Sequence, residues 1–433
     1  MRDVSLETFI KKYYRSHFRL KKFEPGVTPV PVSGKVFDDR ELLFGTQAVL
    51  DGWWTEGEFA EKFEKDFSMV VGARYVSLVN SGSSANLIAF SALTSTVFGE
   101  RALKPGDEVI TVATGFPTTV NPIIQNRCIP VFIDNDIATK NATIDGIKKA
   151  LSKKTKAIML AHTLGNPLPL DEILALVKEK RLWFIEDCCD ALGSTYKGKH
   201  VGTFGDIATF SFYPAHQITM GEGGAVVAQK PLLHKAIRQF RDWGRDCWCD
   251  TGKDDTCHRR FKWQLGDLPM GYDHKYIYSQ IGYNVKLTDM QVAIGLAQLG
   301  KLPGFIKKRK SNFGKLYTGL LKYSRFLTFS TAENGSDPCW FGFAIVVNKN
   351  APFFKLDLVQ YLESKKIGTR SLFAGNLLKH PAYKGRTDIR LSGALTNSDV
   401  LMENGFWIGV YPGISEEMIR YILRTFDMFM KQW

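Results

Sequence analysis

The stretch GDIATFSFYPAHQITMGEGGAVV (residues 205–227) determines how the fold of this 433-residue chain is interpreted. Its two ends, IATFSF and GAVV, are short apolar runs, which is the pattern of strands that are buried on both faces. The loop between them carries His216 and a glycine-rich turn at Gly221–Gly224, and Ser211 lies near the end of the first run. A single histidine in a loop is usually structural, so its meaning depends on the segments around it.

Other short apolar runs precede this stretch and alternate with segments of helical period. They are residues 75–79, 108–112, 130–134, 156–160 and 182–186. The segment SSANLIAFSALTSTVF (residues 83–98) has the clearest helical spacing. Strands that alternate with helices predict an α/β fold with a mainly parallel sheet covered on both faces. Ligands bind such sheets beyond the carboxyl ends of the strands, so we expect the functional site there.

The length of the chain allows two or three domains with a sizeable buried core. We expect an N-terminal helix and arm over residues 1–50. A large domain follows over residues 51–315 and includes a cysteine-rich insertion at 245–275, and a smaller α/β domain covers residues 316–433. One long helix is predicted to run from residue 288 to beyond residue 310.

Charge and hydropathy exclude several classes of function. The chain has 57 basic and 44 acidic residues, a net charge of +13, with dense basic runs at residues 11–22 and 307–310. Both runs have helical apolar spacing, which is typical of solvated helix faces. Because the sequence also has no nucleic-acid-binding signature, we expect no nucleic-acid partner. Small anionic ligands such as phosphates fit the charge better. No apolar run could span a membrane and no signal peptide is recognisable, so a cytoplasmic protein without a membrane partner is expected.

Two further motifs lie at predicted strand ends. NSGSSAN (residues 80–86) follows a strand and opens a helix, where Gly82, Ser83 and Ser84 can offer backbone donors to a phosphate, although a simple serine cap explains the motif equally well. FIEDCCDALGS (residues 184–194) places Asp187 after a buried strand. That carboxylate can cap a helix, bind a metal or pair with a protonated ring nitrogen.

Taken together, these motifs and GYNVKLTDMQVAIGLAQL (residues 282–299) resemble the nucleotide-sugar aminotransferase family, also known as the DegT/DnrJ/EryC1 group. The resemblance runs from about residue 33 to the C-terminus. It implies a fold-type I, aspartate-aminotransferase-like fold and the vitamin-B6 cofactor pyridoxal phosphate. In that family a lysine after the FSFYP segment binds the cofactor covalently, and this chain has His216 in its place.

The histidine changes the expected chemistry, because an imidazole cannot form the covalent link of a primary amine. Pyridoxamine phosphate (PMP), which brings its own amine, suits such a site. His216 can still act as the acid/base, since its ordinary pKa lies near neutrality. The change resembles the branch of the family that dehydrates CDP-4-keto-6-deoxyglucose at C3 for 3,6-dideoxyhexose synthesis. There His216 would take the proton from C4′ of the cofactor while the C3 hydroxyl leaves.

The resemblance also implies roles for other residues. Asp187 would pair with the pyridine nitrogen, Phe116 would stack on the ring, and Asp190 would lie near the ring hydroxyl. The residues expected to contact the cofactor phosphate are Gly82, Ser83, Ser84 and Ser211, with Asn284 reaching the phosphate of a neighbouring subunit in a homodimer. The residues expected to contact the sugar nucleotide are Arg370, Phe373 and Asn376.

Seven cysteines without a secretory signal argue against a disulfide framework. The residues Cys189, Cys247, Cys249 and Cys257 have the spacing C-x57-C-x-C-x7-C, and four thiolates suit a [2Fe–2S] cluster or a zinc ion. A shift of one residue would replace Cys189 by Cys188. The resemblance favours the cluster, which would receive electrons from a separate NADH-dependent flavin/iron–sulfur reductase.

Three alternatives remain open from the sequence. The first is a cluster-free, PMP-dependent sugar 3-dehydratase of the colitose type, and the second is a sugar aminotransferase. The third is not an enzyme: a scaffold on the same fold, stabilised by zinc.

Overall fold

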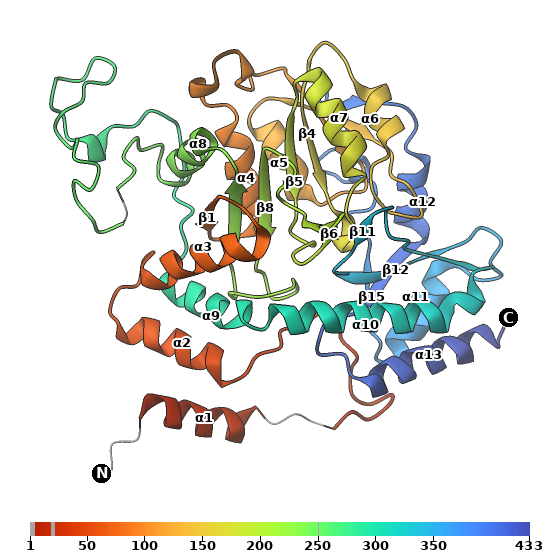
Figure 1. Ribbon diagram of the computed structural model, residues 1–433. Helices are drawn as coiled ribbons and strands as arrows, with labels where there is room; N and C mark the ends of the chain where they lie inside the picture. The colour runs from red at the N-terminus through yellow and green to blue at the C-terminus, as the bar shows by residue number, and fades with distance from the viewer. Residues whose placement is uncertain (1–4, 19–21, 250) are drawn as a thin grey trace.

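The computed structural model describes residues 5–18, 22–249 and 251–433, so Arg19 and Lys21 of the first basic run lie outside the described residues. Figure 1 shows the arrangement of the elements. The α-helices are α1 (Leu6–His17), α2 (Asp39–Leu50), α3 (Glu58–Val71), α4 (Gly82–Ala92), α5 (Pro117–Gln125), α6 (Ile144–Ala150), α7 (Leu170–Lys180), α8 (Pro231–Arg241), α9 (Asp289–Leu299), α10 (Leu302–Leu320), α11 (Lys355–Ser364), α12 (Thr396–Asn404) and α13 (Glu416–Met430). The strands are β1 (Tyr75–Val79), β2 (Glu108–Val112), β3 (Ile129–Ile133), β4 (Thr155–Ala161), β5 (Trp183–Asp187), β6 (Thr195–Tyr196), β7 (Lys199–His200), β8 (Ile207–Ser211), β9 (Gly224–Ala228), β10 (Leu327–Phe329), β11 (Ser336–Asp337), β12 (Gly342–Val347), β13 (Thr369–Ser371), β14 (Arg390–Leu391) and β15 (Gly405–Gly409).

An eight-stranded sheet with the order β1-β9-β8-β5-β4-β2-β3-β14 forms the centre of the molecule. Strand β9 is antiparallel to both of its neighbours, and the remaining pairs are parallel. The predicted α/β fold with a mainly parallel sheet is therefore confirmed. Each strand predicted in this part of the sequence is present, with ends that differ by at most one residue.

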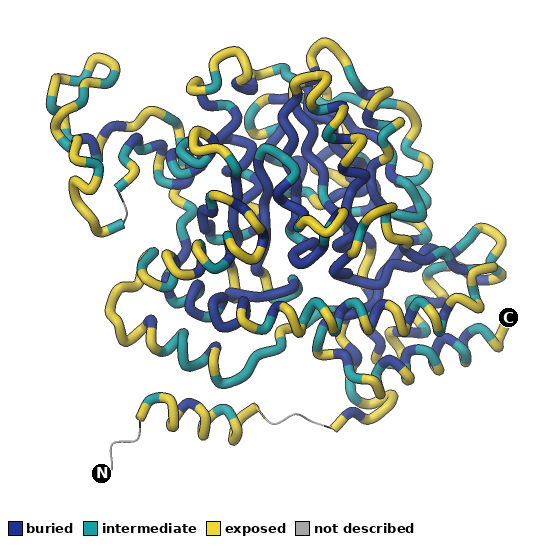
Figure 2. The backbone as a smooth tube through the Cα atoms, in the orientation of Figure 1, coloured by how far each residue is buried: buried dark blue, intermediate teal, exposed yellow. Residues whose placement is uncertain are grey.

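Helices cover both faces of this sheet, because side chains alternate between the faces along each strand. In β4, Ile158 and Leu160 pack into one core with α3, α6, α7 and α9. Ala157 and Met159 pack into the opposite core with α4, α5 and α8. Figure 2 shows the sheet as the most continuously buried part of the chain.

A second, antiparallel sheet with the order β10-β12-β15-β13 packs against α10, α11 and α13. The chain then returns to the large sheet, because β14 pairs in parallel with β3 at its edge. Residues after 316 therefore contribute to both sheets. The domain boundaries drawn from the sequence stay a prediction.

The prediction of a single long helix from residue 288 to beyond residue 310 is wrong, because the segment forms two helices. Helix α9 ends at Leu299 and α10 begins at Leu302, with Pro303 in its first turn. Proline has no backbone N–H and is suited to the first turn of a helix rather than to its interior. The chain therefore starts a new helix at this point.

The insertion between α8 and α9 extends away from the sheet on the left of Figure 1 and is largely exposed in Figure 2. Its described residues contain one short 3₁₀ helix, His274–Tyr276. Among the described residues, no helix is long and apolar enough to cross a membrane.

Candidate functional site

A cleft of about 630 Å³ lies at the carboxyl ends of β1, β5 and β8 and extends to β13. Most of the predicted site residues line it. They are Gly82, Ser83, Phe116, Asp187, Cys189, Asp190, Ser211, His216, Arg370 and Phe373. The strand order brings these residues together from distant parts of the sequence, as expected for a parallel sheet.

Asp187 ends β5 and is held rigidly at the base of the cleft. Its Oδ2 accepts hydrogen bonds from Asn86 Nδ2 at 2.8 Å and from Thr119 Oγ1 at 2.7 Å. Its Oδ1 accepts from the backbone N–H of Cys189 at 3.0 Å. Asn86 is oriented in turn by Thr209, whose hydroxyl donates to Asn86 Oδ1 at 2.7 Å. These contacts fix the carboxylate of Asp187 at the base of the cleft, where it can pair with a ring nitrogen.

The start of α4 forms one wall of the cleft. Gly82 is the first helical residue, and a Cβ there would lie 2.5 Å from Cβ of Ser211 and 3.0 Å from Sγ of Cys189. The glycine is therefore required by close approach rather than by a turn. The N-terminus of a helix together with the Ser83 hydroxyl and Ser211 forms a suitable cradle for a phosphate.

Ser84 lies outside this cradle, contrary to the prediction. Its backbone N–H donates to the Ser81 hydroxyl at 3.0 Å, and its own hydroxyl donates to Asn80 Oδ1 at 2.6 Å. Both groups are used within the helix cap, and Ser84 does not line the cleft.

His216 and Asp190 face each other across the cleft wall, with Nδ1 and Oδ1 3.5 Å apart. His216 Nδ1 and Asp190 Oδ2 are buried without a hydrogen-bond partner. Burial and the charge of Arg309 lower the pKa of His216 to about 3. Burial and the neighbouring Asp187 raise the pKa of Asp190 to about 8. Both side chains are therefore neutral near pH 7.

Arg309 is the functional residue that the sequence analysis missed most clearly. It was assigned to a solvated helix face, but its side chain is fully buried. The guanidinium donates to the backbone carbonyl of His216 at 2.9 Å and to that of Phe341 at 3.2 Å. It also reaches the carbonyls of Trp340 and Ala215 at 3.4 and 3.5 Å. Arg309 thus ties the histidine loop to the second sheet.

The mouth of the cleft is aromatic and basic. The rings of Phe116 and Phe373 pack edge to face with centroids 6.3 Å apart, and Arg370 lies beside them on β13. Asn376 does not reach the cleft, which corrects its predicted contact with the sugar nucleotide. Its amide group instead donates to Asp399 Oδ1 at 2.8 Å and accepts from the N–H of Leu378 at 3.1 Å.

The cleft fits the predicted cofactor. It combines a fixed carboxylate at Asp187, a helix N-terminus, and an exposed aromatic face at Phe116. The unpartnered buried atoms of His216 and Asp190 point to a group that completes their hydrogen bonds. Further lining residues that the sequence did not single out are Ser33, Asn86, Tyr213, Glu222, Phe341 and Trp407. Three of them, Asn86, Tyr213 and Glu222, lie within quoted motifs.

Asn284 lies outside this cleft. It is exposed, and its Oδ1 accepts from Lys286 Nζ at 3.1 Å. Its expected contact with a neighbouring subunit stays a prediction.

The predicted metal ligands are in two different places. Cys189 lies in the cleft wall against Gly82, whereas Cys247, Cys249 and Cys257 lie together in the insertion. Burial and Asp187 raise the pKa of the Cys189 thiol well above its usual range. The structure therefore does not bring the predicted four thiols together within the chain.

The alternative cysteine, Cys188, is fully buried beside His162 and Glu186. His162 already uses both ring nitrogens, since Nε2 contacts Glu186 Oε2 at 3.1 Å and Nδ1 accepts from the N–H of Leu168 at 3.0 Å. This cluster is a satisfied structural pair rather than a metal site. Cys128 and Cys339 are buried, as expected for structural cysteines.

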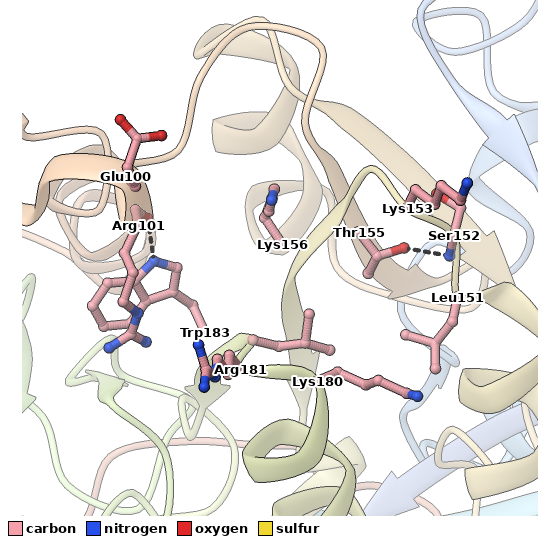
Figure 3. A pocket seen from close by; sticks show the side chains of 11 residues that line it. Glu100, Arg101, Leu151, Ser152, Lys153, Thr155, Lys156, Lys180, Arg181 and Trp183 are labelled. Carbon is pink, nitrogen blue, oxygen red and sulfur yellow. Dashed lines mark hydrogen bonds between the residues drawn. The ribbon is translucent and has the colours of Figure 1, made fainter.

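A second hollow of about 530 Å³ lies at the opposite ends of β4 and β5 (Figure 3). Its basic residues are Arg101, Lys153, Lys156, Lys180 and Arg181. All of them are exposed, and the picture shows the lysine ends well apart. The Arg101 guanidinium stacks on Trp183 at 3.6 Å from the ring centroid. This hollow has no convergent polar centre and lies far from the carboxyl ends of the strands, so the cleft is the candidate active site.

The chain is similar to known proteins over most of its length. Residues 38–427 match the DegT/DnrJ/EryC1/StrS aminotransferase family. The chain is 52% identical to the lipopolysaccharide biosynthesis protein RfbH of Salmonella typhimurium. The alignment covers 98% of this chain and 97% of RfbH. It is 49% identical to dTDP-4-dehydro-2,6-dideoxy-D-glucose 3-dehydratase of Saccharopolyspora spinosa. That alignment covers 97% of this chain and 90% of the relative. The fold also matches a solved structure of Escherichia coli GDP-4-keto-6-deoxy-D-mannose-3-dehydratase with bound hydrated PLP, with a TM-score of 0.82 and 29% sequence identity. The superposition covers 92% of this chain and 98% of the E. coli chain.

Proposed function

Because this chain belongs to the DegT/DnrJ/EryC1/StrS aminotransferase family, we propose that it is a PMP-dependent enzyme that removes the C3 hydroxyl of CDP-4-keto-6-deoxyglucose. The observation that carries this proposal is His216, which stands where the family has its cofactor-binding lysine and faces the cleft with an unpartnered ring nitrogen. Names of similar proteins support the reaction class, since two of them are sugar 3-dehydratases.

The cofactor would be held by groups that the cleft already orients. Helix α4 and Ser211 would bind the phosphate, Asp187 would pair with the ring nitrogen, and Phe116 would lie against the ring. Bound PMP supplies a primary amine for the keto group of the substrate and a ring that accepts electrons.

His216 performs the proton transfer. The imidazole is neutral at pH 7, so a ring nitrogen has a lone pair that can take the proton at C4′ of the cofactor. Arg309 fixes the backbone of His216, and Asp190 lies beside Nδ1. Arg370 and Phe373 lie at the mouth of the cleft, where they suit the diphosphate and the base or sugar of the nucleotide.

A reduction must follow the loss of the hydroxyl to give a 3,6-dideoxy sugar. We assign this to a [2Fe–2S] cluster, which Cys247, Cys249 and Cys257 of the insertion would hold together with Cys189. Such a cluster would supply single electrons, which an NADH-dependent flavin/iron–sulfur reductase would provide. Zinc cannot serve here, because it is redox-inert.

A homodimer completes the proposal. Asn284 is exposed near the base of the insertion and away from the cleft of its own subunit. The insertion also exposes large apolar side chains. They include Trp243, Phe261, Tyr276, Tyr278, Ile281 and Tyr283. A second copy of the chain that covers this surface would bring Asn284 to the neighbouring cofactor.

The test is a reconstituted assay with PMP, the reductase and the CDP-, dTDP- and GDP-linked 4-keto-6-deoxyhexoses. We expect the CDP substrate to lose its C3 oxygen. A product that keeps the C3 hydroxyl and gains an amine from an amino acid would identify an aminotransferase instead. Complete turnover by iron-free protein would identify a cluster-free dehydratase, and no turnover by PMP-loaded protein would favour the scaffold.

A further inference from the structure

Three large apolar side chains, Leu164, Phe341 and Trp407, form an apolar wall of the cleft. We propose that this apolar wall selects a sugar whose C6 is a methyl group over the same sugar with a hydroxyl on C6. The inference rests on the proposed function, because it requires a nucleotide sugar in the cleft with its C4 beside His216. It adds the residues that choose between a 6-deoxyhexose and an ordinary hexose.

The apolar wall begins at His216. The centre of the Phe341 ring lies 5.2 Å from that of the His216 imidazole and 5.2 Å from that of Trp407. The backbone N–H of Phe341 donates to the carbonyl of Leu164 at 2.8 Å, which fixes Leu164 to it. At the other end, Trp407 on β15 is in register with Arg370 on β13. The wall therefore runs from the proposed base toward the arginine that suits the diphosphate.

The side chains of the apolar wall offer no hydrogen bond to a ligand. Their single polar atom, Trp407 Nε1, donates to the carbonyl of Ser371 at 3.0 Å. The guanidinium of Arg309 lies 5.9 Å from the centre of the Phe341 ring, but it is fully buried and donates to backbone carbonyls. A sugar hydroxyl placed against this wall would lose its hydrogen bonds to water without replacement.

Leu164 has an unusual backbone conformation within the wall. Its φ of 50° and ψ of 30° lie in the left-handed region, which a bulky residue rarely adopts. Its N–H contacts the Asp190 carboxylate and its carbonyl accepts from Phe341, so the conformation is fixed on both sides. Strain of this kind concentrates at functional sites. Glycine and asparagine adopt this region most easily, so a buried leucine here indicates that the cleft requires an apolar side chain.

A 4-keto-6-deoxyhexose has one edge that matches the apolar wall. In a hexopyranose, C4 and C1 lie at opposite ends of the ring. One edge between them carries the C2 and C3 hydroxyls, and the other carries the ring oxygen and C6. With C4 at His216 and the C1 diphosphate toward Arg370, the ring lies along the wall, and only the edge with a C6 methyl has no hydroxyl to desolvate there. Polar groups that can pair with the C2 and C3 hydroxyls also line the cleft, on Ser33, Tyr213 and Glu222.

The test compares CDP-6-deoxy-D-glucose with CDP-D-glucose, which differ only in the C6 hydroxyl. Both lack the 4-keto group and therefore do not react with the cofactor. In calorimetric titrations of PMP-loaded full-length protein, the 6-deoxy ligand should bind about 10- to 100-fold more tightly, since an apolar pocket rejects an added hydroxyl by about this factor. Equal dissociation constants would overturn the proposal and leave the proposed function standing.

The same comparison is made with the dTDP-linked pair, and with GDP-6-deoxy-D-mannose against GDP-D-mannose. Binding of only one of these pairs, with a preference for the 6-deoxy ligand, would support the apolar wall while refuting the CDP specificity of the proposed function. Absence of binding by all three pairs would refute both proposals.

Leu164→Asn tests the wall itself. Asparagine adopts the left-handed region readily, so the variant can keep the backbone of Leu164 while it brings an amide to the wall. The preference for the 6-deoxy ligand should fall below about threefold, because the amide can pair with the C6 hydroxyl. Arg127→Asn, at an exposed left-handed position outside the cleft, is the matched control and should keep the wild-type preference. An unchanged preference in Leu164→Asn would overturn the assignment.

A measurement on the wild-type protein does not depend on how well a variant folds. In saturation-transfer NMR with PMP-loaded protein and CDP-6-deoxy-D-glucose, the aromatic protons of the protein are irradiated. Because Phe341 and Trp407 form most of the wall, the C6 methyl should receive more saturation than H2 and H3 of the sugar. Stronger transfer to H2 and H3 would place the hydroxyl edge on the wall and would refute the proposal.

Discussion

Replacing Arg309 by methionine tests how the catalytic histidine is held. The change removes two good charge-assisted hydrogen bonds, to the carbonyls of His216 and Phe341, and two longer ones. Hydrogen bonds to a charged group contribute about 1.5–3 kcal/mol each, and part of this is offset because a buried guanidinium no longer has to be desolvated. We therefore expect Arg309→Met to lower the free energy of unfolding by about 3 kcal/mol, measured by urea denaturation.

The same substitution should change the pH dependence of proton transfer. The charge of Arg309 contributes to holding the pKa of His216 at about 3. Without it the imidazolium forms more easily, the pKa of His216 rises toward its ordinary value, and less of the base is available at acid pH. The acid limb of C4′ proton exchange, measured by NMR with PMP and substrate, should move to higher pH.

The neighbouring Lys310 provides the control. Its side chain pairs with Asp337 at the surface, so Lys310→Met should change the free energy of unfolding by less than about 0.5 kcal/mol and leave the acid limb in place. Equal urea midpoints and equal acid limbs for the two variants would refute the reasoning about Arg309.

Three further predictions follow from the geometry of the cleft. Gly82→Ala should weaken PMP binding at least about tenfold in a spectroscopic titration, because the new Cβ would lie 2.5 Å from the serine at the end of β8; Gly314→Ala, which meets nothing within 4 Å, should bind PMP normally. Thr119→Val removes a hydrogen bond to the Asp187 carboxylate. A hydrogen bond to a charged group contributes about 1.5–3 kcal/mol, so the dissociation constant for PMP should rise about 10- to 100-fold. An unchanged dissociation constant would mean that the carboxylate does not contact the ring. Asn376→Ala should lower stability by about 1 kcal/mol but leave KM for the sugar nucleotide unchanged, and a large rise in KM would restore its predicted substrate contact.

The sheet could be predicted from the sequence because its strands are buried on both faces and read as continuous apolar runs. The order of the strands and the covering helices then bring Asp187, Ser211 and His216 to one cleft. The smaller α/β domain expected after residue 316 has a counterpart in the second sheet and the helices packed on it. The break before α10 was missed, because the helical period continues across it while Pro303 alone marks the new start.

The direction of individual side chains could not be predicted. Ser84 belongs to the NSGSSAN motif and Asn376 was expected from the resemblance, but both use their polar groups in hydrogen bonds within the protein. Arg309 stands in a run of basic residues whose pattern is that of a solvated face, and only the packing of α10 against the second sheet shows that it is buried. The spacing of the cysteines in the sequence likewise does not predict that Cys189 lies in the cleft. Nor does it predict that His274 contacts Cys257.

The most direct test of the central claim is C4′ proton exchange in His216→Asn, measured by NMR in deuterated buffer with PMP and the CDP-linked substrate. The variant should still bind PMP, since the phosphate cradle and Asp187 are unchanged, but its exchange should be slower by about 100- to 10,000-fold than in the wild type. Exchange at the wild-type rate in PMP-loaded His216→Asn would show that another group is the base and would contradict the account.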